Sequence, residues 1–166
     1  AHPVAAAPPV VGVIGAGNFA ARVLIPALAA TPARLRAIAS GGGASAAIAG
    51  RRFGFERALS DTPALLADDA IDTVFIATRH YDHARLVVAA LEAGKHVFVE
   101  KPLALTREEL AAVRAASAAA PRLHLMVGFN RRFAPLAVRM RRLLAGRTQP
   151  LSLIYTVNAG AIPPDH

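Results

Sequence analysis

A glycine-containing turn near the amino terminus has the residue types and spacing of a phosphate-binding loop. The turn, Gly15-Ala16-Gly17-Asn18-Phe19-Ala20, follows the apolar run Val10–Ile14 and precedes a helical stretch. In this position the first glycine allows a tight turn, and the second lets the backbone approach a pyrophosphate. Amide groups at the start of the helix then bind the diphosphate. The turn therefore predicts dinucleotide binding, against the alternative of a tight turn without a ligand.

The residue that selects between the two nicotinamide dinucleotides is expected at the end of the second strand. An acid there would accept hydrogen bonds from the adenosine ribose and favour NAD. This sequence has Ser40 followed by three glycines, so no carboxylate would repel a 2′-phosphate. Arg51 or Arg52 could pair with that phosphate, or both could simply be solvated residues at a helix end. We predict an NAD(P) cofactor, with a preference for NADP.

A polar segment follows the clearest β-strand of the chain. It reads Thr78-Arg79-His80-Tyr81-Asp82-His83 and lies where a parallel sheet presents its ligand-binding edge. Two histidines on either side of an aspartate suggest a metal site, but no third ligand has suitable spacing. We therefore predict no metal, and we expect His83 to pack, to cap a helix or to contact the cofactor.

Glu100-Lys101-Pro102 also follows a predicted strand. Lys101 is one of only two lysines in the chain, the other being Lys95. At this edge of the sheet a lysine could donate a hydrogen bond to a substrate hydroxyl and stabilise the developing alkoxide during hydride transfer. The alternative is a surface lysine next to a turn proline.

Short β-branched runs alternate with alanine- and leucine-rich helical stretches, as in βαβ units. Strands are expected at residues 10–14, 35–40, 55–59, 72–78, 96–100 and 123–128. Pro26 must kink or break the first helix, and Thr106 with Glu109 forms a capping box at the start of another. This order predicts an α/β fold of the Rossmann type, with a doubly wound parallel sheet.

The predicted sheet implies a division of the chain. Residues 1–9 read as a linker, and residues 10–149 as the dinucleotide-binding domain. A seventh strand at Leu151–Val157 has no downstream segment with which to pair. We therefore expect residues 150–166 to begin a second α/β domain in a truncated chain. The strand would be covered by a partner domain, by the first sheet or by another copy in a homo-oligomer.

Composition excludes several classes of protein. The chain has no cysteine, which excludes a disulfide framework, a thiolate nucleophile and a zinc ribbon, and is compatible with a cytoplasmic location. No apolar run reaches the length of about 18 residues that a membrane span requires.

The net charge of +8 is unevenly distributed, because eight arginines and no acid lie between residues 110 and 164. Nucleic-acid binding would require aromatic residues for stacking or a groove-reading element, and aromatic residues make up only 5% of the chain. We expect instead an arginine-lined helix whose acidic partners lie on protein outside this chain. The arginines concerned are Arg131, Arg132, Arg139, Arg141, Arg142 and Arg147.

Four segments resemble the Gfo/Idh/MocA family of glucose-fructose oxidoreductases and inositol dehydrogenases. They read VGVIGAGNFA at Val11–Ala20, VFIATRHYDHA at Val74–Ala84, AGKHVFVEKPLALT at Ala93–Thr106 and VGFNRRFAP at Val127–Pro135. The resemblance covers residues 10–158 and implies a Rossmann domain followed by an open-sheet α/β domain. Its members oxidise or reduce a carbinol carbon of sugars, inositols and related compounds with NAD(P). The linker, the GNFA sequence at residues 17–20 and the Asn158-Ala159-Gly160 segment further resemble a subgroup in which this module follows a zinc-type alcohol dehydrogenase module.

The resemblance also implies a place for each matching residue. Residues along the diphosphate, the ribose and the rest of the cofactor would be Gly15, Gly17, Asn18, Phe19, Ser40, Thr78, Arg79, His80 and His83. Residues near the nicotinamide would be Glu100, Lys101, Asn130 and Arg131, with Lys101 as the catalytic residue that touches substrate. Pro102 would follow a cis bond. Two departures stand out: Arg79 replaces the usual proline, and the acid/base histidine of the second domain has no counterpart here.

These observations predict the nucleotide-binding module of an NAD(P)-dependent oxidoreductase that acts on a CH–OH group of a sugar, inositol or related polyol. The isolated chain should bind cofactor but turn over poorly, because a positioned general base contributes about 10²- to 10⁴-fold to the rate. One alternative is a non-catalytic, cofactor-sensing or protein-interaction module that uses the arginine-rich face. Another is nucleic-acid binding through that face.

Overall fold

The computed structural model describes residues 7–158, 160 and 161. Contacts between Cα atoms divide the chain into two units, Ala1–Phe129 and Asn130–His166. This division falls after Phe129, whereas the sequence places the domain boundary after residue 149. Most of the predicted linker at residues 1–9, and part of the Asn158-Ala159-Gly160 segment, lie outside the described residues.

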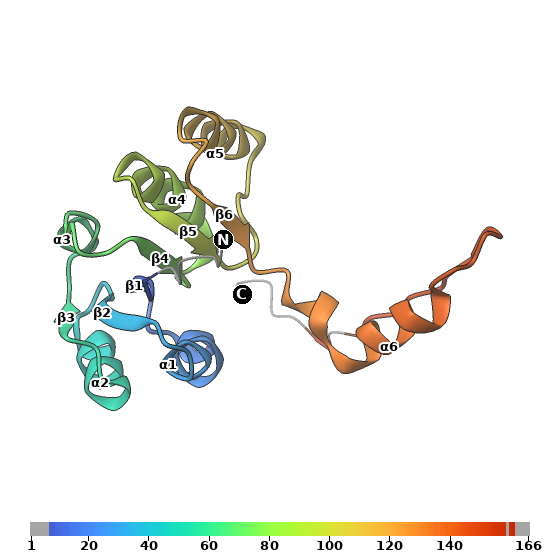
Figure 1. The fold of residues 1–166 in the computed structure, drawn as a ribbon, viewed down its shortest axis with the longest axis horizontal. Helices are drawn as coiled ribbons and strands as arrows, with labels where there is room; N and C mark the ends of the chain where they lie inside the picture. Colours follow the sequence, from blue (N-terminus) through green and yellow to red (C-terminus); the bar gives the residue numbers. More distant parts are fainter. Residues whose placement is uncertain (1–6, 159, 162–166) are drawn as a thin grey trace, which may run out of the picture. The chain divides into compact units, whose positions relative to one another are not determined.

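The first unit is built on a parallel sheet of six strands (Figure 1). The strands are β1 (Val10–Ile14), β2 (Arg34–Ala39), β3 (Arg57–Leu59), β4 (Thr73–Ile76), β5 (His96–Val99) and β6 (Leu125–Val127). Their order is β3-β2-β1-β4-β5-β6. After β1, the chain adds β2 and β3 on one side, then crosses back to place β4, β5 and β6 on the other side of β1. The predicted Rossmann-type doubly wound sheet is confirmed. This order places the carboxyl ends of β1 and β4 side by side, where ligands bind in such sheets.

Helices pack on both faces of the sheet. On one face, α3 (Thr62–Leu66), α4 (His83–Glu92) and α5 (Arg107–Ala119) bury the larger cluster of aliphatic side chains. On the other face, α1 (Ile25–Ala29) and α2 (Ala44–Phe53) bury a second cluster. The strands are buried on both sides where helices cover them, as continuous β-branched runs require.

Two local sequence signals determine how helices begin. Thr106 Oγ1 accepts the N–H of Glu109 at 3.1 Å, and the Glu109 carboxylate accepts the N–H of Thr106 at 3.3 Å, so the predicted capping box is confirmed. Pro26 does not end its helix. Instead, a π-helical turn, η1 (Ala20–Leu24), precedes it, and Ile25 donates its N–H to Ala20. The wider turn accommodates a proline that has no N–H to donate.

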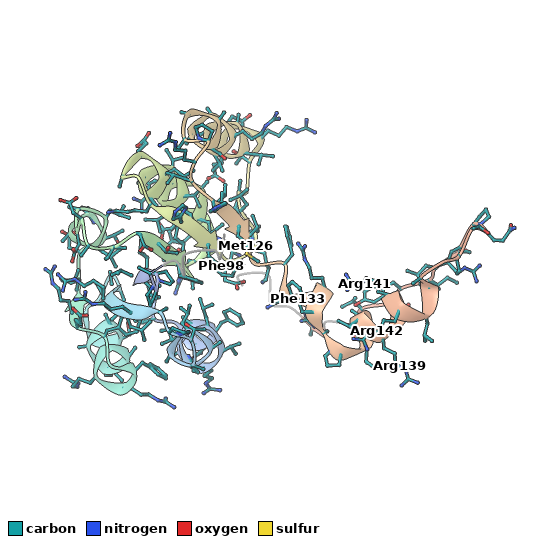
Figure 2. All side chains as sticks on the ribbon, viewed as in Figure 1. Phe98, Met126, Phe133, Arg139, Arg141 and Arg142 are labelled. Carbon is teal, nitrogen blue, oxygen red and sulfur yellow. The ribbon has the colours of Figure 1, made fainter. Side chains whose placement is uncertain are left out.

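Phe98 and Met126 lie on a part of the sheet that the helices of the first unit leave open. They are paired residues of β5 and β6, and Figure 2 shows them next to each other. Their strand neighbours Val97 and Val99 are buried in the cluster under α4 and α5, whereas Met126 is 54% exposed. Within the described residues of the first unit, this face therefore presents apolar side chains to solvent over β6.

The second unit contains a short 3-10 helix, η3 (Asn130–Phe133), and α6 (Pro135–Leu144), and neither buries a side chain. The strand predicted at Leu151–Val157 is wrong, because residues 151–158 have no regular secondary structure. A strand requires a hydrogen-bonded partner strand, and the described residues of this unit contain none. The start of a second α/β domain here stays a prediction.

The six arginines predicted along one helix lie in three segments. α6 carries Arg139, Arg141 and Arg142, whose side chains are exposed (Figure 2). Arg131 and Arg132 precede α6 in η3, and Arg147 follows it. The single helix was wrong because Pro135 starts α6, and the residue before a proline is held in an extended conformation that interrupts a helix.

Candidate cofactor-binding site

A groove of about 650 Å³ lies at the carboxyl ends of β1, β2 and β4. Its walls come from the turn after β1, from Ser40 and Gly41 after β2, from the segment after β4, and from the first residues of α3 and α4. The predicted site residues Gly15, Gly17, Ser40, Thr78 and Arg79 all line it. The structure therefore brings together residues up to 64 positions apart in the sequence.

The turn after β1 contains two glycines, and the fold requires glycine at only one of the two positions. Gly15 has a φ of +105°, and a Cβ there would lie 2.4 Å from the carbonyl oxygen of Ala77. The fold itself therefore requires glycine at this position. Gly17 is exposed, and a Cβ there would meet no atom within 4 Å. Since nothing in the described protein requires Gly17, the open space beside it fits the close approach of a pyrophosphate.

Asn18 and Phe19 follow Gly17 at the start of the helical segment, and both are exposed. Ala20, at the third position of the turn, is 1% exposed and packs in the cluster on that face. The small residue is buried as the turn predicts. The amides of the exposed residues are at the helix start, where a diphosphate would bind.

Ser40 connects the end of β2 to the start of α2. Its hydroxyl accepts the N–H of Ala46 at 3.1 Å and the hydroxyl of Ser45 at 2.8 Å. No carboxylate stands at this end of β2, and Gly41 adds no side chain. Arg51 and Arg52 lie in the last turn of α2, whereas the groove contacts its first turn through Ser45. Neither Arg51 nor Arg52 lines the groove, so the described structure gives their predicted pairing with a 2′-phosphate no support, and it stays a prediction beside the alternative of solvated residues at a helix end.

The segment after β4 contributes both charged and buried groups. Thr78 is half-buried, and its hydroxyl donates to the carbonyl of Arg79 at 3.3 Å, while Arg79 and His80 are exposed. Arg85 donates to the Asp82 carboxylate at 2.8 Å, one helical turn away. Arg79 is therefore the basic group of the groove that lacks a carboxylate partner among the described residues.

His83 is 0% exposed, although it belongs to the same polar segment. Its Nδ1 lies 2.7 Å from the carbonyl oxygen of Pro102, and its Nε2 lies 3.2 Å from that of Thr78. The shorter contact assigns the ring N–H to Nδ1 in the neutral form. His83 thus joins the loop after β4 to the loop after β5. We expect it to act on the site through these two loops rather than by touching a ligand.

Glu100, Lys101 and Pro102 lie at the carboxyl end of β5. Glu100 is 8% exposed, its carboxylate accepts the N–H of Lys101 at 3.3 Å, and a Cβ on Gly128 would lie 2.8 Å from it. Lys101 is exposed, and the Lys101–Pro102 bond is cis, as the resemblance implies. The buried Glu100 carboxylate thus holds the backbone N–H of Lys101, while the Lys101 side chain is exposed.

Asn130 and Arg131, the other two residues predicted near the nicotinamide, belong to the second unit. Their part in the site stays a prediction.

Several groove residues were not predicted from the sequence, and three of them carry polar side chains at helix starts. Ser45, Thr62 and Arg85 line the groove from the first turns of α2, α3 and α4. Helix starts face the ligand-binding edge of a parallel sheet, so the first turns of α2, α3 and α4 carry the same positional signal as the turn after β1. The spacing of Asp82 and Arg85 is a further signal, since residues three apart on a helix are neighbours.

Two findings concern other classes of site. Among the residues that the structure describes, no three His, Cys, Asp or Glu side chains gather closely enough to hold a metal ion. No helix in the described part of the chain has both the length and the apolar character needed to cross a membrane.

Comparison with known proteins agrees with this geometry. The sequence profile of a family described as "Oxidoreductase family, NAD-binding Rossmann fold" matches residues 10–129. A D-xylose 1-dehydrogenase (NADP⁺) of Haloferax volcanii is 37% identical over 134 residues, which is 81% of this chain and 41% of that protein.

Solved structures of similar proteins contain both kinds of cofactor. A 3-ketoreductase from Actinomadura kijaniata, in complex with TDP-benzene and NADP, is 35% identical with a TM-score of 0.76, over 82% of this chain and 43% of that one. A scyllo-inositol dehydrogenase from Lactobacillus casei, with bound NAD(H) and scyllo-inositol, is 29% identical with a TM-score of 0.77, over 82% and 41%. The chain spans less than half the length of these relatives.

Proposed function

The chain belongs to the Gfo/Idh/MocA oxidoreductase family, and from this premise we propose that it binds NAD(P) in the groove after β1, β2 and β4. It would form the nucleotide-binding part of an enzyme that transfers hydride between a nicotinamide and a CH–OH carbon of a sugar, an inositol or a related polyol. Relatives named for xylose and scyllo-inositol support this substrate class.

The open space at Gly17 is the observation that carries the proposal. Glycine is required at Gly15 by backbone conformation and packing, but at Gly17 by neither. A side chain at Gly17 would project from an exposed turn that lines the groove. A ligand that must approach this backbone closely gives the position its physical reason.

Lys101 would perform the polar part of the chemistry. The bound nicotinamide would supply the hydride acceptor or donor. The exposed ammonium of Lys101 would donate a hydrogen bond to the substrate oxygen and stabilise the alkoxide that develops there. Glu100, buried next to it, would hold the backbone from which Lys101 extends.

The reaction also requires a group that takes the hydroxyl proton, and we assign none to this chain. The family's acid/base histidine lies in a second domain, to which the chain shows no matching motif. The chain by itself should therefore bind cofactor but turn over slowly.

The proposed cofactor preference is for NADP. The absence of an acid at Ser40 removes the group that would repel a 2′-phosphate. The xylose dehydrogenase and the 3-ketoreductase, which are named or solved with NADP, are similar to this chain, while the NAD-bound scyllo-inositol dehydrogenase shows that the fold also serves NAD.

Calorimetric titration of the chain with NADP(H) and then NAD(H) tests the proposal. We expect saturable binding, and we expect Gly17→Asp to weaken it by at least about 100-fold, because the carboxylate would meet the pyrophosphate at close range. Ala111→Asp, which adds the same charge on an exposed position of α5, is the matched control and should bind as the unmodified chain does. Equal binding by Gly17→Asp would contradict the pyrophosphate site.

A second candidate function rests on α6. Arg139, Arg141 and Arg142 are exposed and have no carboxylate partner among the described residues. If the folded chain binds neither nucleotide, we propose instead a protein-interaction module in which these arginines contact an acidic partner. A cytoplasmic location and a homo-oligomer stay predictions.

A further inference from the structure

Arg79 differs from Arg85, the other arginine that lines the groove, in having no carboxylate partner among the residues that the structure describes. Arg85 also lines the groove, but its guanidinium donates to the Asp82 carboxylate at 2.8 Å, so the two charges compensate each other. The guanidinium of Arg79 has no carboxylate partner among the described residues, and its side chain is exposed. The groove therefore carries one uncompensated positive charge, and Arg79 supplies it.

The groups at the end of β2 supply neither a competing cation nor an anion. The hydroxyl of Ser40 is engaged by Ala46 and Ser45, and Gly41 contributes backbone only. Arg51 and Arg52 are at the far end of α2. Selection of a phosphorylated ribose therefore requires a charge from a different strand.

The end of β4 is the nearest source of that charge. β1 alone separates β2 from β4 in the sheet, and neighbouring strands lie about 4.8 Å apart. The ends of β2 and β4 are thus about 10 Å apart, a gap that a phosphate group and a long arginine side chain together can span. Ser40 and Arg79 both line the same groove.

We propose that Arg79 pairs with the 2′-phosphate of NADP(H) and is the residue that makes the chain prefer NADP over NAD. The inference rests on the proposed function, which it deepens by assigning the selecting residue to the loop after β4 rather than to the end of β2. A guanidinium can donate two parallel hydrogen bonds to one phosphate, which makes arginine suited to this role.

The test measures dissociation constants for NADP⁺ and NAD⁺ with the unmodified chain, Arg79→Ala, Arg79→Lys and the control Arg51→Ala. Arg51 is an exposed arginine outside the groove, so its variant reports the effect of losing one positive charge anywhere on the surface. We expect Arg79→Ala to weaken NADP⁺ binding by about 10- to 100-fold, the range for a charge-assisted hydrogen bond, and NAD⁺ binding by less than about threefold. Arg79→Lys should keep part of the preference for NADP⁺ over NAD⁺. Lysine keeps the positive charge but cannot donate the two parallel hydrogen bonds of a guanidinium group.

The outcomes separate this inference from the proposed function. If the unmodified chain binds neither cofactor, both fail. If it binds and Arg79→Ala leaves the ratio of the two dissociation constants unchanged, only the assignment of Arg79 fails. Equal weakening of both cofactors would also overturn it, since it would mean that Arg79 contacts a part that they share, such as the adenine ring. A loss of preference in Arg51→Ala as large as in Arg79→Ala would overturn it as well.

Discussion

The two lysines of the chain flank the same strand and have opposite surroundings. Lys95, just before β5, is 5% exposed, and its ammonium donates to the carbonyl of Asp68 at 3.1 Å. Lys101, just after β5 and Glu100, is exposed at the carboxyl edge of the sheet. Because β5 is parallel to its neighbours, these lysines mark the amino and carboxyl ends of the whole sheet. The same side chain is part of the fold at one end and is available to a ligand at the other.

Other charged groups follow the same division. On the amino-terminal side, a network connects three arginines to two carboxylates. Arg36 donates to Glu56 at 2.7 Å and to Asp68 at 3.0 Å, Arg57 donates to Asp68 at 3.1 Å, and Arg34 donates to Glu56. On the carboxyl side, Arg79 has no such partner among the described residues. The charges at the amino end are paired with one another within the fold, whereas the unpaired charge of Arg79 is available to an anionic ligand.

Gly15 lies at the carboxyl end of the sheet, but unlike Lys101 and Arg79 it is required by the fold. Its substitution should therefore lower the free energy of unfolding more than any other change considered below. Gly15→Ala forces an alanine to a φ of +105° and places its Cβ 2.4 Å from the Ala77 carbonyl oxygen. We expect the free energy of unfolding in urea to fall by about 3 kcal/mol or more.

Gly17→Ala is the matched control for that prediction. Its Cβ meets nothing within 4 Å, so the free energy of unfolding should change by less than about 0.5 kcal/mol. If Gly15→Ala unfolds at the same urea concentration as Gly17→Ala, the distinction between a glycine required by the fold and one required by a ligand does not hold.

Asp68 is the centre of the paired charges and should show the next largest effect. Burial by itself raises the pKa of its carboxyl, but hydrogen bonds from Arg36 and from the N–H of Ala70 outweigh burial and lower the pKa. Asp68→Asn removes the charge that serves two guanidinium groups in a half-buried site. We expect a loss of about 1 to 2 kcal/mol in the free energy of unfolding.

Lys101→Ala provides the comparison at the other end of the sheet. Removing an exposed lysine with no carboxylate partner among the described residues should change the free energy of unfolding by less than about 0.5 kcal/mol. If Lys101→Ala lowers the free energy of unfolding as much as Asp68→Asn does, charged side chains at the amino and carboxyl ends of the sheet do not differ in their contribution to stability.

The sequence predicted the elements and the local signals better than the pairings between elements. The six strands and the capping box of Thr106 follow from runs and spacings within a few residues. The network around Asp68 joins groups 11 to 32 residues apart, and no local pattern indicates it. For the same reason the sequence proposed Arg51 and Arg52 for the phosphate, although the helix holds them away from the groove. The strand at 151–157 failed because apolar composition predicts a strand only where a partner strand exists.

The smallest expected effect is the pH dependence of the free energy of unfolding that Glu56 causes, and the direction of this dependence follows directly from the pKa of Glu56. Hydrogen bonds from Arg34 and Arg36 lower the pKa of Glu56 from 4.5 to about 2. Because the folded protein then binds this proton less tightly than the unfolded chain, the contribution of Glu56 to stability is complete above the unfolded pKa of 4.5 and is lost as the pH falls toward 2. Glu56→Gln should therefore be less stable than the unmodified chain at pH 7, and the difference should shrink steadily between pH 5 and 2.

Urea unfolding at several pH values measures this difference directly. Glu92→Gln, at an exposed position at the end of α4 and without an arginine partner among the described residues, is the control and should show no comparable convergence. Added salt should reduce the Glu56 effect, because exposed ion pairs are screened. A difference between Glu56→Gln and the unmodified chain that stays constant from pH 7 to pH 2 would mean that shape rather than charge accounts for it. The contribution of Glu56 would then come from packing rather than charge, and only Asp68 would still support the electrostatic difference between the amino and carboxyl ends of the sheet.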